Sequence, residues 1–151
     1  MTNEIIAKSN IELKVRAQDW RHAMRLAGDL LTKNGYTTEE YTQEMVHAVE
    51  TLGPYIVVAP GIALAHSRPA PSVIKTGLSL TTLVEPVNFG SAPNDPVEIV
   101  FGLCATDSTN HIQIISRLVE FLDDEKNIEF LKRCTDSCDV WLAINRVEEG
   151  V

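Results

Sequence analysis

Residues 53–69 read GPYIVVAPGIALAHSRP and belong to the longest uncharged part of the chain, which runs from Thr51 to Ser67. The β-branched run at 55–59 is bounded by Pro60-Gly61, a pattern that predicts a short strand followed by a turn. The apolar residues after the turn lead to His66, which therefore lies where an extended segment ends and a second turn begins. The prolines and glycines also exclude a membrane helix here, because a spanning helix needs about 20 mostly apolar residues in sequence.

The chain before this stretch predicts one strand and two helices. Alternating apolar and charged residues over 11–15 indicate a strand with one buried face. Asp19 is suited to cap a helix whose apolar residues recur at helical spacing until Asn34-Gly35 stops it. Thr37, with Glu40 three residues later, resembles the capping box of a second helix, which ends where the quoted stretch begins.

Two strands are predicted after the quoted stretch. Residues 76–83 alternate enough for a strand, and the apolar run 97–105 predicts a central one. The region between them, 85–96, is crowded with Pro, Asn, Gly and Asp and predicts a loop, with one brief strand near 87–89.

Helices are predicted for the rest of the chain. Apolar residues three or four positions apart follow Ser108, whose hydroxyl can serve as an N-cap. A short helix follows Asp123-Asp124, and a last one near 140–144 is capped at Thr135 or Asp136. Helices, strands and helices again, without regular alternation, predict an α/β fold with a mixed sheet flanked by helices.

The composition is that of one domain and excludes some partners. With 151 residues, 44% of them hydrophobic, and with no linker or repeat, we expect a single domain over 1–151. Thirteen Lys and Arg against 21 Asp and Glu give a net charge of −8, which excludes general nucleic-acid binding but not a basic partner. The first ten residues do not resemble a secretory leader, and three cysteines cannot all pair within the chain. We therefore expect a cytoplasmic protein without membrane insertion.

His66, Arg68 and His111 are the candidate catalytic residues. His66 has the cation of Arg68 two residues away, and His111 falls in the first turn of a predicted helix, where free N–H groups and the helix dipole attract anions. This combination predicts the handling of a phosphoryl group with imidazole as the nucleophile, because an ordinary pKa of about 6.5 leaves most of a histidine neutral at pH 7. The chain has neither a P-loop nor a Gly-x-Gly-x-x-Gly motif, so we expect the phosphoryl donor to be another protein.

Other interpretations of these residues stay open. His22 and His47 fit solvated helix faces, and His111 also fits a structural role as a partly buried donor to a carbonyl. A hydrolase or metal site built from His66, His111 and Asp107 is a further alternative, although the spacing names no third protein ligand for zinc. The cysteines are expected to be packing residues rather than nucleophiles: Cys104, Cys134 and Cys138.

Several motifs in order along nearly the whole chain carry a family resemblance. They are the quoted stretch, Lys75-Thr76-Gly77, Pro86-Val87-Asn88-Phe89, Asn94-Asp95-Pro96-Val97 and Thr109-Asn110-His111. Together they resemble the IIA component of the bacterial sugar phosphotransferase system, of the mannitol/fructose type, and within that class most of all the ascorbate-specific IIA proteins.

That resemblance implies a three-layer α/β/α fold and a phosphocarrier function. His66 then accepts a phosphoryl group from the phosphocarrier HPr and passes it to a IIB component, which phosphorylates the sugar during uptake through the membrane IIC component. His111 becomes the second active-site histidine, which contacts the phosphoryl oxygens or orients His66. Neither a cofactor nor a metal is needed. Ile62 and Leu64 are expected to be exposed and to form the docking surface for both partners.

Two positions depart from the family pattern. Many members have proline directly before the active histidine, where this chain has Ala65, so we expect a less rigid turn. Mannitol-type members have an arginine at the end of the second helix, where this chain has Glu50. Arg68 is the candidate to supply the missing positive charge.

A regulatory role is the alternative function: a IIA-like domain whose phosphorylation controls a partner protein. The sequence also leaves open the oligomeric state and the sugar, for which ascorbate, a pentitol and galactitol are all compatible.

Overall fold

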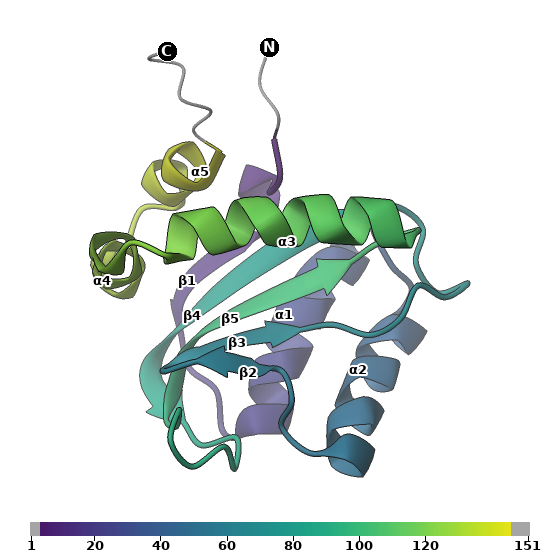
Figure 1. Cartoon of the computed structure of the whole chain (residues 1–151), viewed down its shortest axis with the longest axis horizontal. Helices are drawn as coiled ribbons and strands as arrows, with labels where there is room; N and C mark the ends of the chain where they lie inside the picture. The colour runs from purple at the N-terminus through teal and green to yellow at the C-terminus, as the bar shows by residue number, and fades with distance from the viewer. Residues whose placement is uncertain (1–3, 146–151) are drawn as a thin grey trace.

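The computed structural model describes residues 4–145, and a single five-stranded sheet runs through them (Figure 1). The strands are β1 (Ile11–Val15), β2 (Val57–Ala59), β3 (Ile62–Ala65), β4 (Gly77–Val87) and β5 (Val97–Cys104). They lie in the order β1-β4-β5-β3-β2. β1 and β4 are parallel, as are β3 and β5, whereas β4 and β5 and also β2 and β3 are antiparallel. The predicted mixed sheet is confirmed.

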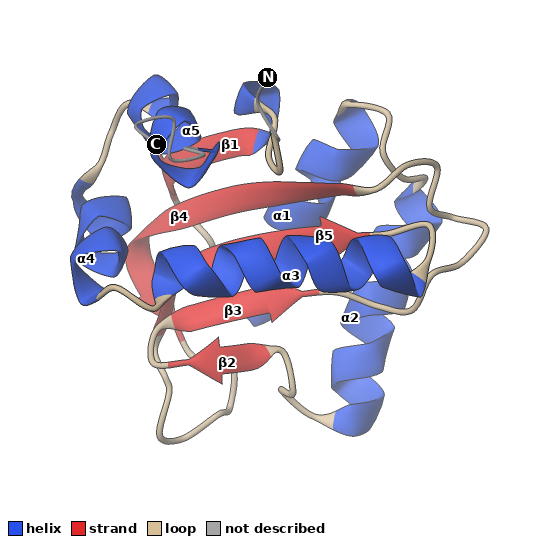
Figure 2. Ribbon diagram, turned by 45° about the horizontal axis from the view of Figure 1, so that its top comes forward, coloured by secondary structure: helices blue, strands red, loops and turns tan. Residues whose placement is uncertain are grey.

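Helices cover both faces of the sheet (Figure 2). α1 (Trp20–Lys33) and α2 (Glu39–Leu52) lie on one face, and α3 (Ser108–Leu122) runs across the other. On the side of α3, α4 (Glu125–Arg133) packs on α3 and β5, and α5 (Ser137–Asn145) packs on β1. A 3₁₀ turn, Lys8–Asn10, precedes β1. The three-layer α/β/α fold is therefore present.

Two hydrophobic cores, one on each side of the sheet, follow from the alternation of side chains along the strands. In β5, Val100 and Cys104 join the core under α1 and α2, whereas Phe101 and Leu103 join the core under α3. A strand buried on both faces reads as a continuous apolar run, which is how β5 appears in the sequence.

The pairing of β3 with β5 determines where His66 and the start of α3 lie. Because the two strands are parallel, with Ala65 opposite Gly102, both end at the same edge of the sheet. His66 follows the last residue of β3, and α3 begins four residues after the end of β5. In open α/β sheets, ligands bind outside the carboxyl ends of such strands.

Most predicted helix boundaries are confirmed. The Asp19 side chain accepts a hydrogen bond from the backbone N–H of His22, and Gly53 caps α2 with a φ of 92°, a conformation that glycine adopts without steric cost. Asp136 rather than Thr135 precedes α5, and its carboxylate accepts a hydrogen bond from the N–H of Cys138.

Two predicted N-caps are wrong by one residue. Thr38, not Thr37, occupies the N-cap position of α2, and its side chain makes no capping hydrogen bond; Thr37 is buried and bridges to Val73. Asp107, not Ser108, caps α3, since its carboxylate accepts a hydrogen bond from the N–H of Asn110 at 2.8 Å. Ser108 is instead the first residue of the helix.

The strands differ from the prediction in length. β2 is shorter than 55–59, and β4 extends through the first part of the predicted loop to Val87. The end of β4 is held by the pairing of Val87 with Val97 and by an ion pair between Glu85 and Arg16 at 3.5 Å.

Candidate functional site

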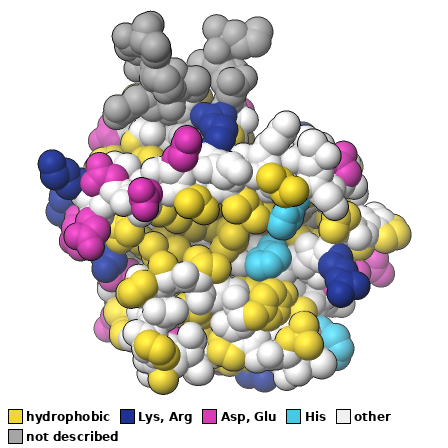
Figure 3. All heavy atoms as spheres, viewed as in Figure 1, with side chains coloured by type: hydrophobic (Ala, Val, Ile, Leu, Met, Phe, Trp, Pro, Cys, Tyr) yellow, Lys and Arg dark blue, Asp and Glu magenta, His cyan; other side chains and the backbone are white. Residues whose placement is uncertain are grey.

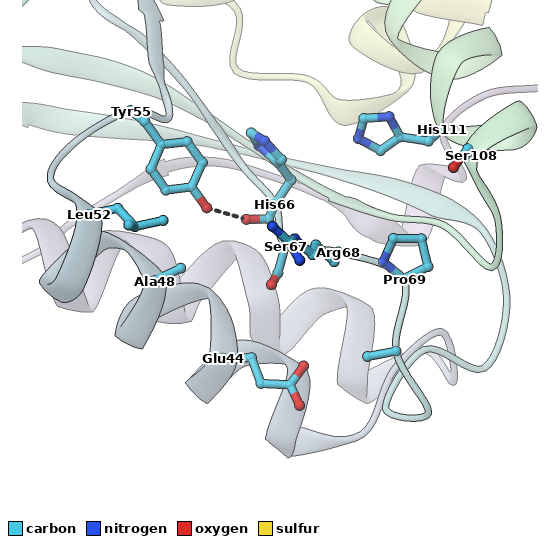
Figure 4. A pocket seen from close by; sticks show the side chains of 11 residues that line it. Glu44, Ala48, Leu52, Tyr55, His66, Ser67, Arg68, Pro69, Ser108 and His111 are labelled. Carbon is cyan, nitrogen blue, oxygen red and sulfur yellow. Dashed lines mark hydrogen bonds between the residues drawn. The ribbon is translucent and has the colours of Figure 1, made fainter.

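An open pocket of about 560 Å³ lies at the edge of the sheet where β3 ends and α3 begins (Figure 4). Its walls come from α2, from Tyr55 after that helix, from the segment after β3 and from the first turn of α3. His66, Arg68 and His111 all line this pocket, so the structure brings the three predicted site residues together.

The imidazole of His66 has one nitrogen engaged and one available. Nδ1 lies 2.7 Å from the backbone oxygen of Leu64. A carbonyl oxygen only accepts hydrogen bonds, so Nδ1 must carry the proton and Nε2 must carry the lone pair. The local backbone thus selects the tautomer in which Nε2 is the nucleophilic nitrogen.

His111 lies beside this ring. The ring centroids of His66 and His111 are 6.0 Å apart and the ring planes are inclined by 56°. Burial lowers the pKa of His111 below its ordinary value, and repulsion from a positively charged His66 lowers it further. His111 is therefore held in its neutral form at neutral pH and presents an N–H group without adding a positive charge.

Arg68 supplies positive charge at the mouth of the pocket. It is exposed, two residues beyond His66 on the segment that follows β3. The opposite wall carries Glu44, whose carboxylate accepts a hydrogen bond from the hydroxyl of the buried Ser72 at 2.9 Å. This bond ties α2 to the segment that carries Arg68.

Two tyrosines that the sequence reasoning missed belong to the site. The ring of Tyr55 meets the His66 ring edge to face, with centroids 5.3 Å apart and planes at 84°, and its hydroxyl donates to the backbone oxygen of His66 at 3.0 Å (Figure 4). Burial raises the pKa of Tyr55, so the phenol keeps its proton. Tyr41, beneath the site, is fully buried and accepts a hydrogen bond from the N–H of Ser67 at 3.0 Å. No local pattern marks either tyrosine, because their partners are distant backbone atoms.

The predicted docking residues Ile62 and Leu64 are not exposed. Both lie within β3 and belong to the core under α3, with exposures of 1% and 7%, so that prediction is wrong. Leu52 and Tyr55 are exposed apolar side chains that line the same pocket as the histidines. Figure 3 shows histidine side chains adjoining a broad hydrophobic area on this face.

The two departures from the family pattern have local explanations. Ala65 is buried at the end of β3 and pairs with Gly102, so the strand ladder holds the chain up to His66 without a proline. Glu50 points toward α1, where its carboxylate lies 2.8 Å from Nε of Arg21, and it does not line the pocket of His66.

The competing site chemistries gain no support from the described part of the chain. Asp107 uses its carboxylate to cap α3, and no group of three possible metal ligands occurs among residues 4–145. Burial raises the pKa of Cys104 to about 12, as expected for a packing residue rather than a nucleophile. Among the described helices, none is both long and apolar enough to cross a membrane.

Comparison with known proteins agrees with the resemblance seen in the motifs. Residues 4–147 match the family model described as "Phosphoenolpyruvate-dependent sugar phosphotransferase system, EIIA 2". The ascorbate-specific PTS system EIIA component of Escherichia coli K12 is 35% identical over 147 residues, which cover 97% of this chain and 96% of that protein.

Solved structures share the fold. The crystal structure of the mannitol IIA of Escherichia coli has a TM-score of 0.81 at 34% identity and covers 92% of this chain and 98% of its own. Enzyme IIA of the mannitol system, solved in complex with phosphorylated enzyme IIB from the same species, has a TM-score of 0.81 at 32% identity, with coverage of 92% and 96%. The match to the family model over nearly the whole chain shows that the protein belongs to the EIIA type 2 family of the phosphoenolpyruvate-dependent sugar phosphotransferase system.

Proposed function

We propose that this chain is a phosphocarrier that takes a phosphoryl group from HPr onto Nε2 of His66 and passes it to a IIB component. The observation that carries the proposal is the hydrogen bond between Nδ1 of His66 and the Leu64 oxygen, at 2.7 Å. It leaves a lone pair on Nε2 of a ring that lines an open pocket, next to His111 and Arg68.

The transfer needs no proton to leave His66. The lone pair of Nε2 attacks the phosphorus, the bond that joins the phosphoryl group to HPr breaks, and the electron pair of that bond stays with HPr. Nδ1 keeps its proton, and the positive charge that the ring gains lies against the Leu64 oxygen. Transfer to IIB runs the same way, with the electron pair of the P–N bond returning to Nε2.

His111 and Arg68 neutralise the charge of the moving group. A neutral His111 donates an N–H to a phosphoryl oxygen, and Arg68 offers a planar fork of donors that suits phosphate. Catalysis of phosphoryl transfer consists mainly of such positioning and charge stabilisation, so no metal or cofactor has a part in the proposed step.

The partners follow from the family and from the surface. A relative solved in complex with phosphorylated IIB supports a IIB component as the partner of this chain. The exposed Leu52 and Tyr55, which line the pocket, supply the apolar part of such an interface. Ascorbate is the proposed sugar, because curated relatives that are 35% identical carry that specificity in their names. The chain then works in the cytoplasm, beside a membrane IIC component.

The test is phosphoryl transfer from phosphoenolpyruvate through enzyme I and HPr, followed by intact mass. We expect one added phosphoryl group in the wild type and none in His66→Ala. His47→Ala is the matched control, because the His47 side chain is 79% exposed on α2 and does not line the pocket. Modification that persists in His66→Ala, or an unmodified wild type, would overturn the proposal.

A second stage separates the carrier from the regulatory alternative. The phosphorylated chain is mixed with the ascorbate-type IIB component, and the phosphoryl group is followed on both proteins. Rapid transfer to IIB supports the carrier function. A phosphorylated chain that never transfers to IIB but changes its binding to another protein supports the regulatory alternative.

A further inference from the structure

Two tyrosine hydroxyls form hydrogen bonds with the peptide group that joins His66 to Ser67, one with its C=O and one with its N–H. Tyr55 donates a hydrogen bond to the oxygen of His66 at 3.0 Å. The N–H of the same peptide group belongs to Ser67, and it donates to the hydroxyl of Tyr41 at 3.0 Å. Tyr41 lies in the first turn of α2, and Tyr55 lies in the loop between α2 and β2. Two separate segments therefore contact this peptide group.

Tyr41 is itself fixed to the sheet. Its side chain is fully buried, and its hydroxyl lies 2.7 Å from the oxygen of Leu103 in β5, with the Ser67 oxygen as a second acceptor at 3.2 Å. Burial raises its pKa far above the ordinary value for tyrosine, so the hydroxyl stays protonated. Tyr41 therefore connects the residue after His66 to the end of β5.

This connection matters because His66 lies just beyond the strand ladder. The last pair of β3 with β5 is Ala65 with Gly102, so the ladder does not fix the backbone of His66. The ring orientation depends on that backbone, since Nδ1 folds back onto the oxygen of Leu64, two residues earlier. Holding the following peptide group in place limits how far the backbone of His66 can move, and with it the ring that the Cα of His66 carries.

We propose that the hydroxyls of Tyr41 and Tyr55 are positioning groups that clamp the His66–Ser67 peptide and so aim Nε2 at the incoming phosphorus. This proposal rests on the phosphocarrier function proposed above. In-line transfer depends on alignment, and a misplacement of about 1 Å can cost on the order of a hundredfold in rate. The clamp acts on the chemical step and not on the affinity for HPr.

The experiment measures single-turnover phosphoryl transfer at rising concentrations of phosphorylated HPr, which separates the maximal rate from the half-saturating concentration. We expect Tyr55→Phe to lower the maximal rate about tenfold with an unchanged half-saturating concentration, because the ring stays and only the hydroxyl is lost. Tyr36→Phe is the matched control. It removes the hydroxyl of a tyrosine whose ring packs under Lys75, outside the pocket.

A second readout follows the His66 ring directly. Nitrogen NMR of the imidazole reports the share of molecules with the proton on Nδ1. We expect that share to fall in Tyr55→Phe and to equal the wild-type value in Tyr36→Phe. A purely structural role of the Tyr55 hydroxyl would not change the tautomer of a neighbouring ring.

The outcomes distinguish the clamp from the function on which it rests. If the wild type accepts no phosphoryl group, the phosphocarrier function and the clamp both fail. If the wild type is active and Tyr55→Phe matches Tyr36→Phe in rate and tautomer, only the clamp fails. A change in half-saturating concentration alone would mean that the Tyr55 hydroxyl acts in docking rather than in positioning, and it also overturns the clamp. Tyr41→Phe is tested in the same way if its melting temperature stays near that of the wild type. If it does not, the result for Tyr55→Phe alone decides whether the clamp exists.

Discussion

The imidazole rings of His66 and His111 lie 6.0 Å apart between centroids, although one follows a strand and the other lies in the first turn of a helix. At this distance, a positive charge on one ring disfavours a positive charge on the other. The pKa of His111 is accordingly lowered, first by burial and then by His66. In the proposed transfer, His66 is the nucleophile and His111 is a neutral hydrogen-bond donor.

The first prediction concerns the titration of His111. In His66→Gln the repulsion is gone, so the pKa of His111 rises above its wild-type value but stays below the ordinary value, because burial remains. Phosphorylation of His66 places negative charge beside His111 and raises the pKa further. NMR titration of the His111 ring measures all three states. An identical pKa in wild type and His66→Gln would show that the rings do not interact.

The second prediction concerns Arg68. Arg68→Gln removes the positive charge at the mouth of the pocket, and we expect the maximal rate of phosphoryl transfer from HPr to fall about tenfold, since the residue is exposed and partly screened by solvent. Arg68→Lys restores part of the rate. Arg133→Gln on α4 is the control for loss of one exposed positive charge. Equal rates in the two glutamine variants would remove Arg68 from the site.

The sequence predicts those parts of the fold that depend on nearby residues. Asp19 and Gly53 mark helix ends because capping involves atoms within a few positions along the chain. The cap of α3 was misplaced by one residue because Asp107 and Ser108 are adjacent and both suit the role. The far end of β4 was missed because it is held by Val97 and Arg16, which are distant in the sequence.

The residues of the site likewise fall into those that nearby sequence predicts and those that depend on distant contacts. His66 and Arg68 are neighbours in the sequence and were predicted together. The approach of His111 depends on the parallel pairing of β3 with β5, which the residue pattern does not reveal. The family resemblance implies only that His111 is the second active-site histidine. Tyr41 and Tyr55 were missed because they act on backbone atoms of Ser67 and His66, 26 and 11 residues away.

The third prediction concerns Glu50. Its ion pair with Arg21 joins α2 to α1 with side chains that are 40% and 43% exposed, so Glu50→Ala should lower the free energy of unfolding by less than about 1 kcal/mol. We expect the rate of phosphoryl transfer to be unchanged, because Glu50 does not line the pocket of His66. Urea unfolding and the HPr assay measure the two quantities. A clear loss of transfer would place Glu50 in the site after all.

The fourth prediction concerns Leu52, the last residue of α2, which lines the pocket and is 72% exposed. An exposed leucine beside the nucleophile is stabilised by burial only when a partner covers it. Leu52→Ala should therefore raise the half-saturating concentration of HPr about fivefold, which corresponds to about 1 kcal/mol of lost apolar burial, while the maximal rate stays within about twofold. Leu142→Ala is the matched control, since Leu142 is 56% exposed on α5 and does not line the pocket.

The same pair of variants in the IIB assay shows whether both partners use this surface. Equal half-saturating concentrations for the two variants would mean that HPr docks elsewhere, whereas a lower maximal rate in Leu52→Ala alone would mean that this side chain shapes the pocket rather than the interface.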